Sequence, residues 1–208
     1  MALYNKLEDL ISSFDVQSIS EERKGVLTEL VNYVQEKVEL GLEIRLNFIC
    51  THNSRRSHLS QIWARVAAYY FDIGFISCYS GGTEATALFP IVAETLSTQG
   101  FEILKLSESE NPIYGVKYDS NMDPVIAFSK TYDHPFNPSA EYAAVMTCSD
   151  ADQNCPVIMG AEKRIPVTYN DPKKYDGTDL QKEKYAQRSI EIATEMFYVF
   201  SQIEVETE

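Results

Sequence analysis

The sequence predicts an α/β fold in which a parallel sheet is covered by helices on both faces. Short apolar runs typical of buried strands alternate with longer runs whose apolar residues recur at helical spacing. The chain has 208 residues, of which 44% are hydrophobic and 24% charged, and this fits one good-sized domain with some additions. Strands that alternate with helices form parallel sheets, whose ligands bind at the carboxyl ends of the strands.

The predicted elements follow in chain order. Helices at 3–14 and about 20–40 come first, and Gly41 ends the second. We interpret residues 1–41 as an added helical hairpin and residues 42–208 as the main domain. The remaining elements are expected as a strand at 44–49, a helix at 57–71, a strand at 75–79, a helix at 90–98, a strand at 102–106, a hairpin with strands at 113–118 and 125–128, a strand at 142–147 and a final helix at 180–203.

Charge and composition exclude several functional classes. The formal net charge of −13 argues against wholesale nucleic-acid binding. No apolar run approaches the roughly 20 residues needed to cross a membrane, and the N-terminus lacks the apolar core of a signal peptide. Four cysteines without a secretion signal indicate a reducing cytoplasm, where cysteines are more often catalytic or redox-active than structural.

Residues 50 to 57 are the most informative segment, because a cysteine, a polar loop, an arginine and a serine stand between a strand and a helix. The N–H groups and dipole of a helix N-terminus favour a Cys50 thiolate and bind a dianion. The planar fork of Arg56 suits two oxyanion oxygens, Ser57 can donate a hydrogen bond to the thiolate, and Asn53 can brace the loop. The segment predicts a nucleophilic cysteine acting on a tetrahedral oxyanion such as phosphate or arsenate, and the bland alternative is a buried cysteine that ends a strand. The residues expected around the anion are Thr51, His52, Asn53, Ser54, Arg55 and Arg56.

Cys148 and Cys155 lie seven residues apart on a polar segment that follows the strand at 142–147. Three interpretations remain open. A metal site is disfavoured, since zinc-binding cysteines are usually closer in sequence and no histidine is near. The two thiols can be unrelated, or they can form a redox relay with Cys50 in which a flexible loop closes to a disulfide.

Asp171 is a candidate general acid. It precedes Pro172, which stiffens the segment that carries it, and a carboxyl group near an oxyanion can protonate a leaving oxygen. Asp-Pro is also a common turn signal.

Together these motifs resemble the low-molecular-weight tyrosine phosphatase superfamily and, within it, the thioredoxin-coupled arsenate reductases. The cysteine-pair segment is the most specific part, because ordinary phosphatases of the superfamily lack it. The resemblance implies a four-stranded parallel sheet in the catalytic domain, with the hairpin at 113–128 as an insertion. The matching segments are Phe-Ile-Cys-Thr-His-Asn-Ser-Arg-Arg-Ser, Tyr79-Ser80-Gly81-Gly82, Cys-Ser-Asp-Ala-Asp-Gln-Asn-Cys-Pro and Asn-Asp-Pro.

The resemblance also implies roles for individual residues. Cys50 would attack arsenate, Arg56 and Ser57 would support the anion and the thiolate, and Asp171 would help to expel water or hydroxide. Cys148 would attack the Cys50–arsenic adduct and release arsenite. Cys155 would then attack Cys148, and thioredoxin would reduce the resulting disulfide.

No cofactor follows firmly from the resemblance. Asn53 and Ser80 match positions that help to bind a potassium ion in some relatives, but Gln61 stands where a glutamate ligand is expected. His52 stands where a glycine is usual, and Arg55 would add positive charge at the mouth of the loop. Cys78, on the second strand, is interpreted as a small buried hydrophobe.

Two other functions compete with arsenate reduction. One is hydrolysis of phosphotyrosine or of a small phosphate ester, which needs only Cys50, Arg56 and Asp171. The other is a non-enzymatic sensor of oxyanions or redox state that signals through the N-terminal helices. A missing nucleophile or acid would favour the sensor, and neither is missing.

Overall fold

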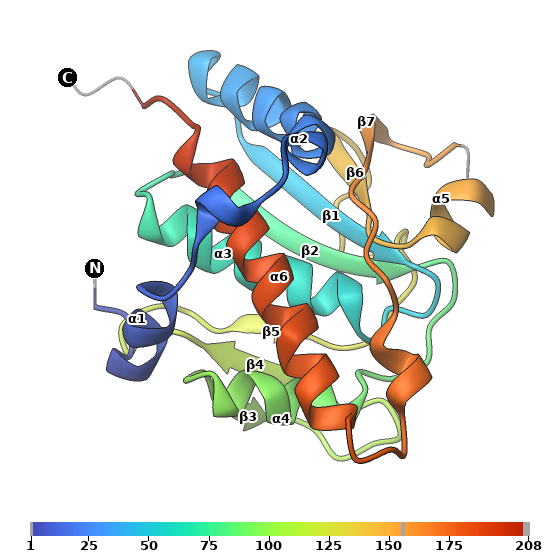
Figure 1. The fold of residues 1–208 in the computed structure, drawn as a ribbon. Coiled ribbons are helices and arrows are strands. Elements are labelled where there is room, and N and C mark those ends of the chain that lie inside the picture. Colours follow the sequence, from blue (N-terminus) through green and yellow to red (C-terminus); the bar gives the residue numbers. More distant parts are fainter. Residues whose placement is uncertain (1, 155–156, 206–208) are drawn as a thin grey trace.

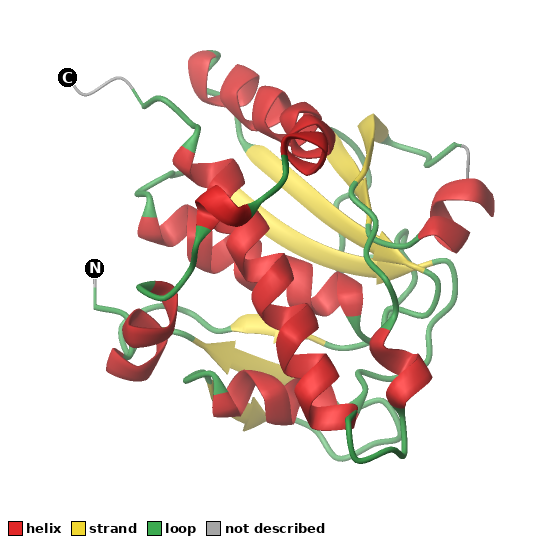
Figure 2. Ribbon diagram, viewed as in Figure 1, coloured by secondary structure: helices red, strands yellow, loops and turns green. Residues whose placement is uncertain are grey.

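The computed structural model describes residues 2–154 and 157–205. Its centre is a four-stranded parallel sheet in the order β2-β1-β6-β7 (Figures 1 and 2). Parallel strands end at one edge, so Cys50 lies beside Gly82, and Ile49 lies beside Met146. The strands are β1 (Ile44–Cys50), β2 (Ile76–Gly82), β6 (Tyr142–Met146) and β7 (Ala161–Pro166).

Helices and loops cover the two faces of the sheet unequally, and the predicted fold class is confirmed. Leu46 and Phe48 point into the main core, to which α2, α3 and α6 contribute. Ile49 belongs to a smaller buried cluster on the other face, beside α5, as the alternation of side chains along a strand requires. The α-helices are α1 (Asn5–Ile11), α2 (Glu21–Glu39), α3 (Arg56–Tyr70), α4 (Pro90–Thr98), α5 (Ser149–Asn154) and α6 (Gln181–Ser201), and two short 3-10 helices are η1 (Val16–Ser18) and η2 (Pro172–Tyr175).

A second, antiparallel sheet contains β3 (Glu102–Lys105), β4 (Tyr114–Lys117) and β5 (Val125–Ala127). β4 and β5 form the expected hairpin. The strand expected at 102–106 pairs with β4 instead of joining the parallel sheet, because a nearby segment pairs in antiparallel fashion without the long crossover that parallel pairing needs. The fourth parallel strand is β7, which the sequence did not predict.

The N-terminal helices are not paired as the predicted hairpin. α1 lies near the small sheet, where Leu3 forms an isolated bridge with Asp119 and the Tyr4 N–H donates to the Tyr118 carbonyl. α2 contacts β1, β7 and α6 (Figure 1). It begins where Ser20 Oγ accepts a hydrogen bond from the Arg23 N–H, which is a standard N-cap. Both helices contribute leucines to the main core.

Candidate active site

The loop after Cys50 offers a set of unpaired backbone donors. Cys50 is the last residue of β1 and is 4% exposed, and α3 begins at Arg56. No backbone N–H of residues 51–55, all of which the structure describes, donates a hydrogen bond to another protein group. Orphan N–H groups that precede a helix N-terminus are a binding site for an anion. The loop therefore has the donors that a tetrahedral oxyanion needs.

Asn53 fixes the direction of the hydrogen bond between Ser57 and Cys50. The Lys130 N–H donates to Asn53 Oδ1 at 2.9 Å, so the amide nitrogen of Asn53 faces Ser57 and donates to its Oγ at 2.9 Å. Ser57 thus keeps its own hydrogen for Cys50 Sγ, 3.1 Å away. A donor at this distance favours a thiolate. Asn53 also has a left-handed backbone with φ 44°, which asparagine tolerates.

His58 is a further part of the site, which the sequence analysis did not single out. Its Nε2 lies 2.9 Å from the Asn53 carbonyl, which can only accept, so Nε2 carries the hydrogen. Nδ1 then accepts from Ser80 Oγ at 3.1 Å. Burial, reinforced by the positive charge of Lys130, lowers the pKa of His58 to about 3. Neutral His58 therefore ties the left-handed residue of the loop to the end of β2.

The predicted anion-binding arginine and the predicted acid are neighbours. One terminal nitrogen of Arg56 donates to the Tyr169 carbonyl at 2.9 Å, and the other donates to Asp171 Oδ2 at 2.6 Å. Asp171 also caps η2 by accepting from the Lys173 N–H. Arg56 Nε has no hydrogen-bond partner, and each terminal nitrogen has a second N–H, so the guanidinium keeps donors for an oxyanion while it holds Asp171 and the carbonyl.

Two loop side chains point away from the expected anion site. Arg55, expected to add charge at the mouth, donates instead to the Tyr185 hydroxyl and to Asp176, because α6 and η2 pack beside the start of α3. The side chain of His52 is 46% exposed and lies 3.7 Å from Glu84. For both residues the backbone N–H remains available to an anion, whereas the side chain does not face the loop interior.

The loop is enclosed by the segment that follows β2. Ser54 Oγ donates to the Ala87 carbonyl at 2.7 Å, and the Thr51 carbonyl accepts from the Glu84 N–H at 2.8 Å. A Cβ added at Gly82 would lie 2.7 Å from both the Asn53 nitrogen and the Thr51 oxygen. The glycine is therefore required by close packing of two backbone segments.

Cys148 lies next to the loop. The Ile49 carbonyl accepts from the Thr147 N–H at 2.7 Å, and this contact joins the ends of β1 and β6. Cys148 Sγ is 3.4 Å from Thr51 Oγ1, and Cys148 and Cys50 share the smaller buried cluster. Cys155 lies outside the described residues. Residues 149–154, which were expected to belong to a flexible loop between Cys148 and Cys155, form α5.

Cys78 is separate from these thiols. It lies on β2, its side chain packs against the main core, and its partly enclosed setting raises the pKa of its thiol to about 12. Cys78 was interpreted as a buried small hydrophobe, but it is only partly buried.

The residues near Asn53 and Ser80 do not fit a potassium ion. The Asn53 oxygen accepts from the Lys130 N–H, and the Ser80 hydroxyl donates to His58. Lys130 itself is 1% exposed, and its Nζ donates to the Phe128 carbonyl at 3.3 Å and lies over the Phe128 ring. The two oxygens expected to bind the ion are therefore already engaged with protein groups. Within the described residues, no group of three or more histidine, cysteine or acidic side chains is arranged to hold a metal.

Comparisons with known proteins agree with this geometry. Arsenate reductases of Bacillus licheniformis and Bacillus subtilis are 29% and 28% identical over 141 residues, which is 68% of this chain and 83% of each relative. The solved low-molecular-weight phosphotyrosine phosphatase of Vibrio cholerae O395 matches 76% of this chain and 94% of its own with a TM-score of 0.50 and 13% identity. The chain has the fold of the low-molecular-weight phosphatases and is similar in sequence to arsenate reductases. No protein-family model matches the chain.

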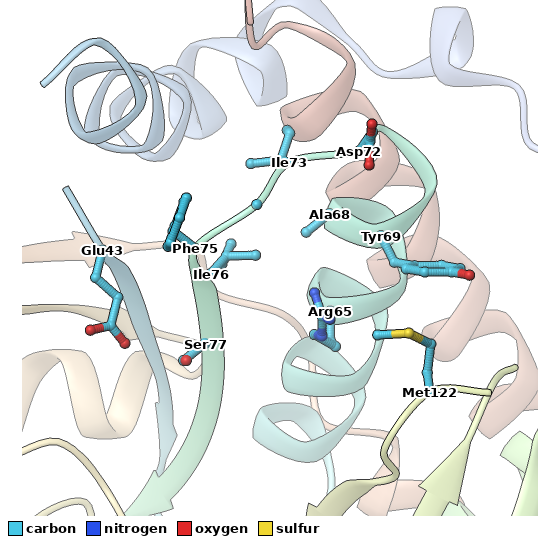
Figure 3. A pocket seen from close by; sticks show the side chains of 11 residues that line it. Glu43, Arg65, Ala68, Tyr69, Asp72, Ile73, Phe75, Ile76, Ser77 and Met122 are labelled. Atoms are coloured by element: carbon cyan, nitrogen blue, oxygen red, sulfur yellow. The ribbon is translucent and has the colours of Figure 1, made fainter. Parts of the chain in front are cut away.

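A small pocket of about 180 Å³ lies near the loop and is lined in part by Asp171 and Pro172. Another, of about 450 Å³, is remote from the loop and lies at the start of β2, between Phe75 and Arg65 of α3 (Figure 3). Cys50 stands at the opposite end of the parallel strands. In the parts of the chain that the structure describes, no helix has the length and apolar character needed to span a membrane.

Proposed function

We propose that this protein reduces arsenate through a relay of three thiols, Cys50, Cys148 and Cys155, and that thioredoxin regenerates it in a reducing cytoplasm. The observation that carries the proposal is the position of Cys148 beside the Cys50 loop, with its sulfur 3.4 Å from Thr51 Oγ1. A phosphatase needs no second thiol at this point. The names of the related arsenate reductases support the same choice of substrate.

The first step is attack of the Cys50 thiolate on arsenic, with loss of water or hydroxide and formation of a sulfur–arsenic bond. The orphan N–H groups of residues 51–55 would hold the anion, and Ser57 would stabilise the thiolate. Asp171 would supply the proton for the leaving oxygen. These roles for Arg56, Ser57 and Asp171 stay proposals.

The second step transfers two electrons. Cys148 attacks Cys50 Sγ, the sulfur–arsenic bond breaks with its electron pair going to arsenic, and arsenite leaves. Arsenic is thereby reduced from the pentavalent to the trivalent state, and the two thiols are oxidised to a disulfide. Cys155 then attacks Cys148 and frees Cys50, and thioredoxin reduces the new disulfide by the same exchange chemistry.

The last exchange requires α5 to unwind. Cys148 immediately precedes this helix and Cys155 immediately follows it. The six residues of α5 rise about 9 Å at 1.5 Å each, whereas the Cα atoms of a disulfide lie within about 7 Å. A helix of six residues has little stability of its own, so the unwinding is energetically accessible.

Three cysteine variants and one matched control test the proposal. Cys148→Ser and Cys155→Ser should abolish repeated turnover of arsenate with thioredoxin, thioredoxin reductase and NADPH, but should retain hydrolysis of 4-nitrophenyl phosphate. Cys50→Ser should lose both activities. Cys78→Ser is the control, because Cys78 packs on the main core away from the loop, and it should retain both.

Peptide mapping after arsenate turnover gives the deciding product. A Cys148–Cys155 disulfide is expected in the wild type. If arsenate turnover is unchanged in both the Cys148 and Cys155 variants, the relay is wrong. Hydrolysis of phosphate esters without arsenate turnover would identify a phosphatase.

A further inference from the structure

Arg55 forms a closed ring of hydrogen bonds with two residues far along the chain. Its Nε donates to the Tyr185 hydroxyl at 2.6 Å, and one terminal nitrogen donates to Asp176 Oδ2 at 2.7 Å. The Tyr185 hydroxyl in turn donates to Asp176 Oδ1 at 2.6 Å. All three groups therefore contact one another, and the guanidinium also lies over the Phe89 ring at 4.3 Å.

The protonation states of this ring are stable near neutral pH. Burial alone would lower the pKa of Arg55, but the hydrogen bond with Tyr185 and the charges around it raise that pKa. Burial, followed by the hydrogen bond to Asp176, raises the pKa of Tyr185. Arg55 thus stays a cation and Tyr185 stays a phenol. The side chains of Arg55 and Asp176 are 12% and 27% exposed, so their ion pair is largely shielded from water.

The next residue, Arg56, holds the other end of the same segment. Its guanidinium binds the Tyr169 carbonyl and the Asp171 carboxylate. Residues 169–176, which include η2, are consequently attached to the Cys50 loop at both ends by consecutive arginines. Asp171 stands between the two attachments, and η2 also contacts α6, the helix that carries Tyr185.

We propose that Arg55, Asp176 and Tyr185 form a positioning clamp that holds the segment carrying Asp171 against the Cys50 loop. The clamp rests on the proposed function, in which Asp171 is the acid. Arg55 is then a positioning residue that acts through Asp176. Its side chain binds the segment and does not bind the oxyanion. The two adjacent arginines bind different ends of this segment: Arg56 contacts Asp171 and the Tyr169 carbonyl, and Arg55 contacts Asp176.

The geometry requires an arginine at position 55. One guanidinium reaches both Tyr185 and Asp176 through separate N–H groups, whereas a lysine amine is a single point that cannot match this fork. A small displacement of a catalytic group lowers rates by one to two orders of magnitude. Arg55→Lys should therefore loosen the segment without removing the positive charge.

Two substrates with different leaving groups can test whether the clamp positions Asp171 or only supports the fold. Phenyl phosphate needs a proton on its leaving oxygen, whereas 4-nitrophenyl phosphate needs it far less. Tyr185→Phe and Arg55→Lys should lower kcat about tenfold for the phenyl ester and less than about threefold for the nitrophenyl ester, with KM nearly unchanged. In an Asp171→Asn background, Tyr185→Phe should cause no further loss for the phenyl ester. Equal losses for the two esters, or additive losses in the Asp171→Asn background, would overturn the clamp.

Hydrogen exchange tests the clamp in the intact chain without any turnover. Peptides that cover residues 170–177 should exchange faster in Tyr185→Phe and Arg55→Lys than in the wild type, and unchanged exchange in both variants rejects the proposal. Lys182→Met is a matched control, since it removes an ion pair with Glu94 from the start of α6 where the Lys182 side chain is 77% exposed. Its exchange and kcat should equal those of the wild type. If Cys148→Ser still turns over arsenate, the thiol relay is wrong, but the hydrogen-exchange test of the clamp is unaffected.

Discussion

Acidification should destabilise this protein through His58. The folded chain holds His58 neutral, with its Nε2–H bonded to the Asn53 carbonyl and its Nδ1 accepting from Ser80. A proton on Nδ1 would break the second bond and place a charge beside Lys130. The unfolded chain takes up this proton freely, so the two states differ in bound protons as the pH falls.

The size of the effect follows from the two pKa values. Burial lowers the pKa of His58 from 6.5 to about 3 in the folded state. The stability contribution is therefore complete above pH 6.5 and is lost as the pH falls toward 3. One pH unit corresponds to about 1.4 kcal/mol. At pH 5, roughly 1.5 units below the unfolded value, the loss amounts to about 2 kcal/mol.

Urea unfolding at pH 7 and pH 5 measures this loss, and His58→Gln removes it. Because all other titrating groups are shared, the wild type should lose about 2 kcal/mol more than the variant between the two pH values. His52→Gln is the control, since the side chain of His52 is 46% exposed, and it should follow the wild type. A difference below about 0.5 kcal/mol between the wild type and His58→Gln would refute the reasoning.

Three further predictions concern the backbone, α5 and the buried amine. Gly82→Ala should lower arsenate turnover and 4-nitrophenyl phosphate hydrolysis at least tenfold, because the added Cβ would misplace the loop. Gly25→Ala is the control and should lower neither activity, since nothing is found within 4 Å of its added Cβ. Equal activities in the two variants would contradict the close packing at Gly82. Asp152→Asn removes the charge from the ion pair of 2.5 Å between Arg164 of β7 and Asp152 of α5 but keeps the hydrogen bond from Arg164 to the Asp152 carbonyl, so rapid-quench mass spectrometry should show the second disulfide forming up to about fivefold faster. Slower formation would mean that this pair does not restrain α5. Burial lowers the pKa of Lys130 to about 7, so Lys130→Met should raise the unfolding free energy at pH 7 by about 1–3 kcal/mol. That gain should shrink as the pH rises from 7 to above 10.5, because both states of the wild type then hold a neutral amine; a gain that is independent of pH would exclude this cause.

Local signals predicted the elements that build the loop. The apolar run ending at Cys50 gave β1 within one residue, and the helix expected at 57–71 is α3, Arg56–Tyr70. Pro90 marked the start of α4, since proline suits the first turn of a helix. The bond from Ser57 to Cys50 was also foreseeable, because a serine at the start of the helix faces the loop that precedes it.

Other features depended on contacts that sequence spacing does not encode. β7 reads Ala-Glu-Lys-Arg-Ile-Pro, which is polar because it is an edge strand and is only partly buried. Arg55 and Arg56 are adjacent and chemically identical, yet the backbone aims one at Asp176 and the other at Asp171. The role of His58 depends on β2, which places Ser80 against its ring.

The sheet topology explains why two thiols far apart in the sequence meet at one point. β1 and β6 are neighbouring parallel strands, and Thr147 bonds to the Ile49 carbonyl through both its N–H and its hydroxyl. The residues that follow, Cys50 and Cys148, must then leave the sheet at the same edge. Cys50 leads into the loop before α3, and Cys148 immediately precedes the short helix α5. In the proposed relay, the loop before the longer helix α3 would hold the oxyanion, and the shorter, less stable helix α5 would let Cys148 pass its oxidation on to Cys155, so the difference in length between α3 and α5 would separate binding from the redox step.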